Sequence, residues 1–178
     1  FIMFTIGITK GRWNSLLTAL QQFKDDYDRN QPMWRVLPEF CQKHKNYERM
    51  GLRDLCQHVH TLYAKYDIAR LTTDMYLSDL TPAMKPSDAY AQIARRNTER
   101  VSVDALEGRI TTSLLTPYPP GIPLLVPGEV FNKKIVDYLK FAREFNLQCP
   151  GFETDIHGMV EEVGEDGVKR YYADCVKV

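Results

Sequence analysis

The stretch that decides the fold is Thr116-Pro-Tyr-Pro-Pro-Gly-Ile-Pro-Leu-Leu-Val-Pro-Gly-Glu129, in which five of fourteen residues are proline and two are glycine. Each proline fixes φ at about −65° and removes a backbone donor, and the residue before it is pushed into an extended conformation. Gly121 and Gly128 can turn where other residues cannot. The segment is therefore predicted to run as stiff extended pieces joined by turns. On composition alone it is a rigid surface connection between two strands, and the alternative is a functional loop.

Alternating residues on both sides of this stretch predict β-structure. Val101 and Val103 alternate with polar neighbours, and residues 110–115 show the same period of two. The tail is predicted to form a hairpin with strands at 159–163 and 168–178, because Gly164-Glu-Asp-Gly167 supplies a turn with positive φ. Between the two regions, Asn132 is a candidate N-cap of a helix with an inward stripe. That stripe consists of Ile135, Leu139, Ala142 and Phe145.

The first half of the chain is predicted to be mainly helical. Residues 1–6 are apolar enough for a buried strand, and Gly7 ends it. Thr9 is a plausible N-cap for an amphipathic helix, whose stripe is Trp13, Leu16, Leu17, Leu20, Phe23 and Tyr27. A second stripe follows Gly51 and consists of Leu52, Leu55, Cys56, Val59, Leu62, Tyr63 and Tyr66.

Shorter helices are predicted between and after these two. A helical turn is expected at 39–43 within a proline-interrupted connection, a short helix within 67–80, and another from Pro86 to about Asn97. Helices early and strands late indicate an α+β fold. We expect an α+β domain at 31–178, preceded at 1–30 by the last strand and helix of a small α/β subdomain.

Length and charge limit the classes of function. The chain of 178 residues is 44% hydrophobic and 26% charged, as is usual for one globular domain. Lys plus Arg and Asp plus Glu both number 23, so no net field attracts nucleic acid or an anionic membrane. The chain starts at Phe1 without a basic leader, which predicts a cytoplasmic location and a piece of a larger protein.

The cysteines do not indicate a metal site. Cys41, Cys56, Cys149 and Cys175 lack a Cys-x-x-Cys spacing, so reduced structural thiols are expected. Cys56 and His60 are four residues apart on a predicted helix, a spacing that two metal ligands can use. No second pair accompanies them, so core packing is the preferred interpretation and no metal is expected.

Several irregular motifs, together with the proline-rich stretch, resemble the C-terminal region of the bacterial ornithine/lysine/arginine decarboxylases, which are pyridoxal-phosphate enzymes. They are Gly151-Phe-Glu-Thr-Asp-Ile-His-Gly158, Ile8-Thr-Lys-Gly-Arg-Trp-Asn-Ser-Leu-Leu17, Leu37-Pro-Glu-Phe40, Glu48-Arg-Met-Gly-Leu-Arg-Asp-Leu55 and Met84-Lys-Pro-Ser-Asp-Ala-Tyr90. The resemblance is greatest to ornithine decarboxylase. It implies conversion of ornithine to putrescine and carbon dioxide by a homodimer that can assemble further.

The resemblance also implies that the catalytic centre lies upstream. In this family the lysine that binds pyridoxal phosphate follows a Ser/Thr-x-His triplet, and no lysine here follows one. We therefore expect no catalytic or cofactor-binding residue in this chain, and no activity from it alone. The chain would instead support the active-site entrance and the pairing of subunits. Lysine or arginine as the substrate is the alternative within the family.

Five residues are candidates for a substrate channel or an interface. Tyr118 offers an aromatic face with a polar tip on a stiff loop. Glu129 comes just before a predicted helix, where its carboxylate would attract a cationic substrate. Thr154, Asp155 and His157 can form a proton-handling group, although a turn capped by Asp155 and Thr154 accounts for the same residues without chemistry.

A second class of function is a non-enzymatic module that binds an interaction partner or an anionic effector. Its candidates are the proline-rich stretch and five arginines, Arg49, Arg53, Arg95, Arg96 and Arg100. A solvated face with local ion pairs explains the same arginines. The resemblance implies that lysine-specific relatives carry an effector-binding arginine at the position of Gly51, where this chain has glycine. Nucleotide regulation at this position is therefore not expected here.

Overall fold

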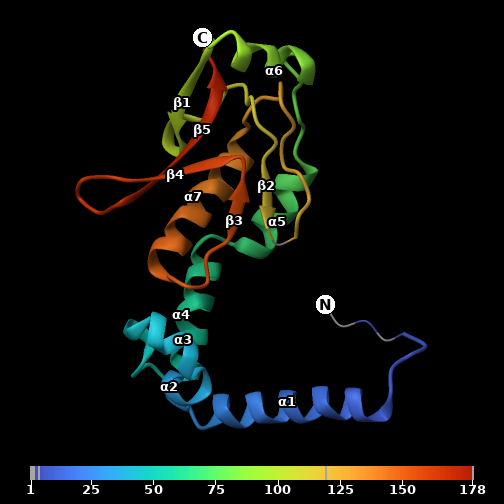
Figure 1. Ribbon diagram of the computed structural model, residues 1–178, viewed down its shortest axis with the longest axis vertical. Helices are drawn as coiled ribbons and strands as arrows, with labels where there is room; N and C mark the ends of the chain where they lie inside the picture. The colour runs from blue at the N-terminus through green and yellow to red at the C-terminus, as the bar shows by residue number, and fades with distance from the viewer. Residues whose placement is uncertain (1–2, 4, 119, 178) are drawn as a thin grey trace. The chain divides into compact units, whose positions relative to one another are not determined.

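The computed structural model describes residues 3, 5–118 and 120–177. It divides into two compact units, Phe1–Thr61 and Leu62–Val178, and the division falls within helix α4 (Leu52–Lys65). Figure 1 shows the course of the chain through both. The domain boundary predicted at residue 30 stays a prediction. No described helix is long and apolar enough to cross a membrane.

The first unit begins with α1 (Lys10–Asp28), the helix predicted from its stripe. Thr9 occupies the N-cap position, but its side chain makes no capping hydrogen bond. The strand predicted at 1–6 is wrong for its described members: Met3 and Thr5 lie outside any strand, and Ile6 is fully exposed in a turn. Residues 1, 2 and 4 lie outside the described residues. A strand needs a neighbour to satisfy its backbone, and these described residues pair with none.

Two short helices and the start of α4 enclose a small core. The helices are α2 (Met33–Val36) and α3 (Pro38–Lys43), followed by a 3₁₀ turn at Lys45–Tyr47. The turn predicted at 39–43 is therefore confirmed as α3. Pro38 starts this helix at its first position, where the missing N–H costs nothing. The core consists of Met33, Cys41, Tyr47, Leu52 and Leu55, and Cys56 packs against it.

The N-terminus of α4 is capped by the side chain of Asn30, which lies 21 positions before Gly51 in the sequence. The Oδ1 atom of Asn30 accepts hydrogen bonds from the backbone N–H groups of Arg53 (3.0 Å) and Asp54 (3.3 Å). These are the second and third positions of the helix, which an N-cap side chain ordinarily serves. Gly51 leaves room for this amide, because a Cβ atom there would lie 2.1 Å from Asn30 Oδ1.

Gly51→Ala is therefore expected to expel the Asn30 amide and to lower the stability of the first unit by about 1 kcal/mol, the usual cost of a lost cap. In an Asn30→Gly background, which keeps the positive φ of 49° at residue 30 but removes the amide, the same change should cost roughly half of that or less. Urea unfolding followed by tryptophan fluorescence measures this, since both tryptophans, Trp13 and Trp34, lie in the first unit. Equal costs in the two backgrounds would contradict the coupling.

The second unit contains two antiparallel sheets. Strands β1 (Thr98–Ser102), β5 (Lys169–Val176) and β4 (Met159–Val163) form one sheet in the order β1-β5-β4. Strands β2 (Thr116–Tyr118) and β3 (Asp155–His157) form the other. The predicted hairpin is confirmed as β4 and β5, with Gly167 at a φ of 74° in its turn.

The strand predicted at 110–115 is wrong as a continuous element. Ile110, Thr111 and Leu115 form only isolated bridges, each to a different segment. The Thr111 hydroxyl accepts from the backbone N–H of Ser113 and donates to its carbonyl at 2.8 Å. This local turn competes with a regular ladder. Val103 likewise leaves β1 and starts a 3₁₀ turn, Val103–Ala105.

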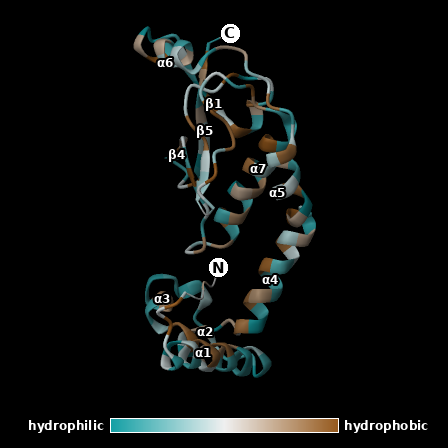
Figure 2. Ribbon diagram, turned by 90° about the vertical axis from the view of Figure 1, so that its right-hand side faces the viewer, coloured by the Kyte–Doolittle hydropathy of each residue, from teal (hydrophilic) through white to brown (hydrophobic). Residues whose placement is uncertain are grey.

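Helix α7 (Lys133–Gln148) is the buried helix of the second unit. Asn132 is its N-cap and accepts from the backbone N–H of Ile135 at 3.0 Å, as predicted. The four predicted inward residues, Ile135, Leu139, Ala142 and Phe145, are all buried. Helix α5 (Ile68–Leu77) packs on α7, and hydrophobic residues line both (Figure 2). Helix α6 (Pro86–Ala94) confirms the prediction from Pro86 onward.

Candidate functional site

Three of the five predicted site residues meet on one exposed face of the β2–β3 sheet. Tyr118 is the register partner of Asp155, and Thr116 is the partner of His157. Because side chains alternate along a strand, Tyr118, Asp155 and His157 share one face. His157 Nε2 lies 3.3 Å from Asp155 Oδ2, and the Tyr118 and His157 rings meet edge to face with centroids 6.3 Å apart.

The proline-rich stretch holds Tyr118 in this position. Pro117 is buried on the opposite face of the sheet, so the strand cannot rotate about its axis without exposing it. Gly121, with a φ of 83°, turns the chain back beneath the Tyr118 ring, whose nearest atoms would lie 3.2 Å from a Cβ there. Tyr118 is 62% exposed and the His157–Asp155 pair is also open to solvent. The face is thus a fixed aromatic and polar surface that suits contact with a ligand or a neighbouring protein surface.

Glu129 is engaged within its own loop. Its carboxylate Oε2 accepts from the backbone N–H of Val126 at 2.8 Å and closes the turn at Pro127-Gly128. Asn132, three residues later, caps α7, so the Glu129 carboxylate is not the group at the start of that helix. A channel role for Glu129 stays a prediction.

Asp155 and Thr154 do not cap a turn with their side chains. Asp155 begins β3 and pairs with His157, and the turn before it is closed by Glu153, whose Oε2 accepts from the Gly151 N–H at 2.8 Å. Thr154 is held through its backbone by Asn146. Both Thr154 and Asp155 line a cavity that the sequence did not predict.

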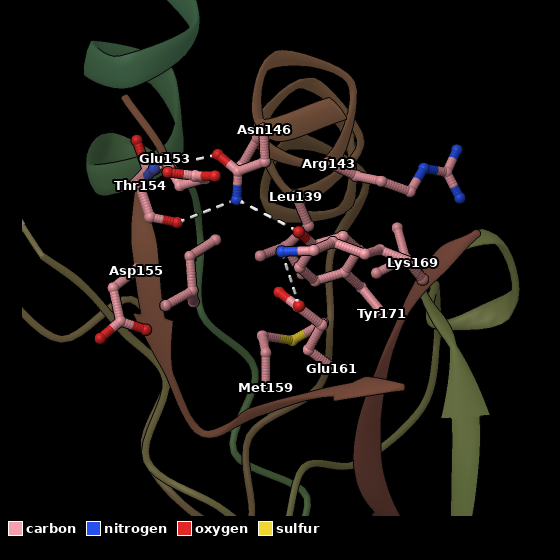
Figure 3. A pocket seen from close by; sticks show the side chains of 13 residues that line it. Leu139, Arg143, Asn146, Glu153, Thr154, Asp155, Met159, Glu161, Lys169 and Tyr171 are labelled. Atoms are coloured by element: carbon pink, nitrogen blue, oxygen red, sulfur yellow. Dashed lines mark hydrogen bonds and ion pairs between the residues drawn. The ribbon is translucent and has the colours of Figure 1, made fainter. Parts of the chain in front are cut away.

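This cavity, of about 290 Å³, lies between α7 and the strands β3, β4 and β5 (Figure 3). Its apolar lining comes from Leu139 and Ala142 of α7, Ile156 of β3 and Met159 of β4. Its polar lining comes mainly from the β3 segment and from the β4–β5 hairpin. An apolar surface with a few converging polar groups is the usual composition of a small-molecule site.

Asn146 is the polar centre of the cavity wall. It is only 6% exposed, and its Oδ1 accepts from the Thr154 N–H at 2.9 Å. Its Nδ2 donates to the Thr154 carbonyl at 3.1 Å and to the Tyr171 hydroxyl at 3.4 Å. The sequence carried a signal for it, since Asn146 follows Leu139 and Ala142 at helical spacing and is a polar residue on an apolar stripe.

The hairpin brings charge to the cavity. Lys169 Nζ lies 2.9 Å from Glu161 Oε1, and this hydrogen bond raises the pKa of Lys169 above its usual value. Burial raises the pKa of Tyr171, which lies beside Lys169 on β5. Because both pKa values are raised, Lys169 and Tyr171 are protonated at neutral pH. Arg143 of α7 forms a bidentate ion pair with Asp104, with N–O distances of 2.6 and 3.1 Å.

The residues that line this cavity do not fit a pyridoxal phosphate site. Lys169, the lysine in the cavity, is paired with Glu161, and no lining residue belongs to the first turn of an α-helix, where a phosphate would be bound. Within the described part of the chain, no group of three or more His, Cys, Asp or Glu side chains can hold a metal ion. Arg100, one of the five arginines considered for an anionic effector, pairs with Glu162 and Asp174.

Comparison with known proteins identifies the family. The sequence model of the family described as "Orn/Lys/Arg decarboxylase, C-terminal domain" matches residues 69–177. The chain is 43% identical to a lysine decarboxylase of Pseudomonas aeruginosa. The alignment covers 99% of this chain and 24% of that protein. The chain therefore belongs to the Orn/Lys/Arg decarboxylase family and contains its C-terminal domain.

Solved structures and more distant relatives agree with this assignment. The structure of lysine decarboxylase A from Pseudomonas aeruginosa superposes with a TM-score of 0.89, over 99% of this chain and 24% of that one. The constitutive ornithine decarboxylase of Escherichia coli is 34% identical over 91% of this chain and 23% of its own length. The chain thus spans about a quarter of the length of these relatives. The family and the α+β fold are confirmed, but the greater resemblance expected to ornithine decarboxylase is not supported.

Proposed function

We propose that this chain is the C-terminal part of a pyridoxal-phosphate-dependent decarboxylase that converts L-lysine to 1,5-diaminopentane and carbon dioxide in the cytoplasm. The observation that carries the choice of lysine is the identity of 43% to a lysine decarboxylase against 34% to an ornithine decarboxylase. Pyridoxal phosphate supplies the electron sink that decarboxylation of an amino acid requires. The residues that bind it belong to the part of the relatives that this chain does not match.

Helix α1 supports a larger protein around the chain. Its apolar stripe is open to solvent: the exposed fractions are 48% for Leu17, 53% for Leu20 and 51% for Phe23. One apolar groove on this helix is lined by Trp13, Leu16, Leu17 and Leu20. An apolar strip of this kind on a soluble protein marks a contact surface. This chain covers 24% of the length of the matched relatives, so their remaining part is about three times as long as this chain. We propose that the corresponding part of the larger protein covers the stripe.

The face of Tyr118, Asp155 and His157 is proposed to contribute to the active-site entrance or to the pairing of subunits in a homodimer or higher oligomer. Its side chains are exposed and fixed, which suits a contact that forms only in the assembled enzyme. The alternative of a stand-alone binding module is not favoured, because residues 69–177 match the C-terminal domain of the Orn/Lys/Arg decarboxylases.

A substrate panel tests the proposal. The parent polypeptide, loaded with pyridoxal phosphate, is assayed with lysine, ornithine and arginine separately, and the amine products are measured by chromatography. We expect kcat/KM for lysine to exceed that for ornithine by roughly tenfold or more, since one methylene in a fitted pocket is worth about this factor. The isolated 178-residue chain is the control and should show no turnover. A preference for ornithine would refute lysine as the substrate, and inactivity on all three would refute the decarboxylase assignment.

A further inference from the structure

We infer that the cavity between α7 and strands β3, β4 and β5 binds an unbranched alkyl diammonium ion, a methylene chain with a primary ammonium group at each end. The lining carries this inference by itself. It therefore holds whichever amino acid the intact protein decarboxylates.

The middle of the cavity suits a methylene chain. Leu139 and Ala142 of α7 lie on one side, and Ile156 and Met159 lie on the strand side. At about 290 Å³ the cavity is at the lower limit of small-molecule pockets, which excludes a nucleotide or another large planar ligand. A chain of four or five carbons is of a size that such a space can enclose.

The polar groups at the two sides of the cavity attract cations. Glu153 approaches from the segment before β3 and Glu161 approaches from β4 (Figure 3), whereas the Asp155 carboxylate pairs with His157 on the other face of β3. Arg143 also lines the cavity, but its guanidinium is paired with Asp104 and points away from the space. Two carboxylates, those of Glu153 and Glu161, thus face one ammonium group, that of Lys169. An anionic ligand would meet net repulsion there, and the carboxylates do not form a metal site.

Lys169 shows how the cavity holds an alkylammonium group. Its side chain is a four-carbon stem ending in a primary ammonium. The stem lies beside Tyr171 and the ammonium reaches Glu161 at 2.9 Å (Figure 3). A second alkylammonium can share Glu161 with Lys169 at one end and meet Glu153 at the other. Two separated ammonium groups match this arrangement better than one.

The test is a titration of the 178-residue chain with 1,5-diaminopentane and 1,4-diaminobutane, followed by NMR of its backbone amides. We expect shift changes concentrated at Thr154, Glu161 and Lys169. The control ligand, 5-amino-1-pentanol, has the same length but one ammonium fewer, and it should bind about fivefold more weakly, as expected for one partly exposed ion pair. Absence of localised shifts with either diamine, or equal binding of the amino alcohol, would overturn the inference.

Two neighbouring glutamates on β4 provide matched variants. Glu161 faces the cavity, whereas Glu162 is on the other face and pairs with Arg100. Glu161→Gln should weaken diamine binding about fivefold, and Glu162→Gln should leave it unchanged. Both variants remove one surface carboxylate, so a general effect of charge changes both equally. Equal weakening by the two variants would therefore overturn the site, because the attraction would then be a property of the whole surface.

Discussion

Gly158→Ala is expected to lower the free energy of unfolding of the second unit by roughly 3 to 5 kcal/mol. Gly158 is the single residue between β3 and β4, and it has a φ of 90°. A Cβ atom there would lie 2.2 Å from the backbone oxygen of Leu114 and 3.0 Å from its carbonyl carbon. Backbone atoms cannot move aside as a flexible side chain can, so either β3 or the 114–115 segment must shift.

Gly167→Ala separates the conformational cost from the steric one. Gly167 also has a positive φ, of 74°, but a Cβ atom there would meet no atom within 4 Å. This variant should cost only about 1 kcal/mol, the penalty of a left-handed backbone for alanine. Urea unfolding followed by near-ultraviolet circular dichroism of the tyrosines compares the two. Similar losses for both variants would show that β3 tolerates displacement and that the close approach to Leu114 is unimportant.

The comparison also bears on the candidate site, because Gly158 is where the chain passes from one sheet to the other. His157, on one side of it, belongs to the exposed face with Tyr118. Met159, on the other side, lines the cavity. A displacement at this residue should therefore disturb both surfaces, whereas a change in the distal hairpin turn at Gly167 should disturb neither.

The elements that could be predicted from the sequence are those whose own pattern is long. Helices α1, α4 and α7 each repeat an apolar stripe over several turns, and the β4–β5 hairpin has a turn with two glycines. Strand β3 has only three residues, and its partner β2 lies about 40 positions earlier. Such a short strand is stabilised by pairing with its partner strand, and three residues are too few to show an alternating pattern in the sequence. The strand predicted at 110–115 was wrong because the Thr111 hydroxyl bonds locally, which alternation of polarity does not reveal.

The candidate site was predictable residue by residue but not as an arrangement. Tyr118, Asp155 and His157 were selected for their chemistry, and the register of β2 with β3 is what brings them onto one face. The cavity was missed because Asn146 and Lys169 converge from elements distant in the sequence. Ornithine was preferred over lysine on motifs in a region that, in our proposal, does not contain the substrate pocket. Such motifs define the family and carry no direct information about the side chain of the substrate.

Leu139→Ala is expected to destabilise the second unit by about 3 kcal/mol, within the range for a buried leucine. Leu139 is 2% exposed, and it lies on the inward stripe of α7 one turn before Ala142. Truncation removes three carbon atoms next to a cavity of about 290 Å³, so the loss is not repaired by collapse of neighbours and the cavity grows.

The same substitution at Leu147 is the control, because Leu147 belongs to the same helix but is 46% exposed. The two changes have the same effect on intrinsic helix propensity, so their difference isolates burial. We expect Leu147→Ala to change the stability by roughly 0.5 kcal/mol or less in urea unfolding. If both variants lose equally little, α7 is not the core of this unit, and the cavity wall that it forms would lack the rigidity that a binding site requires.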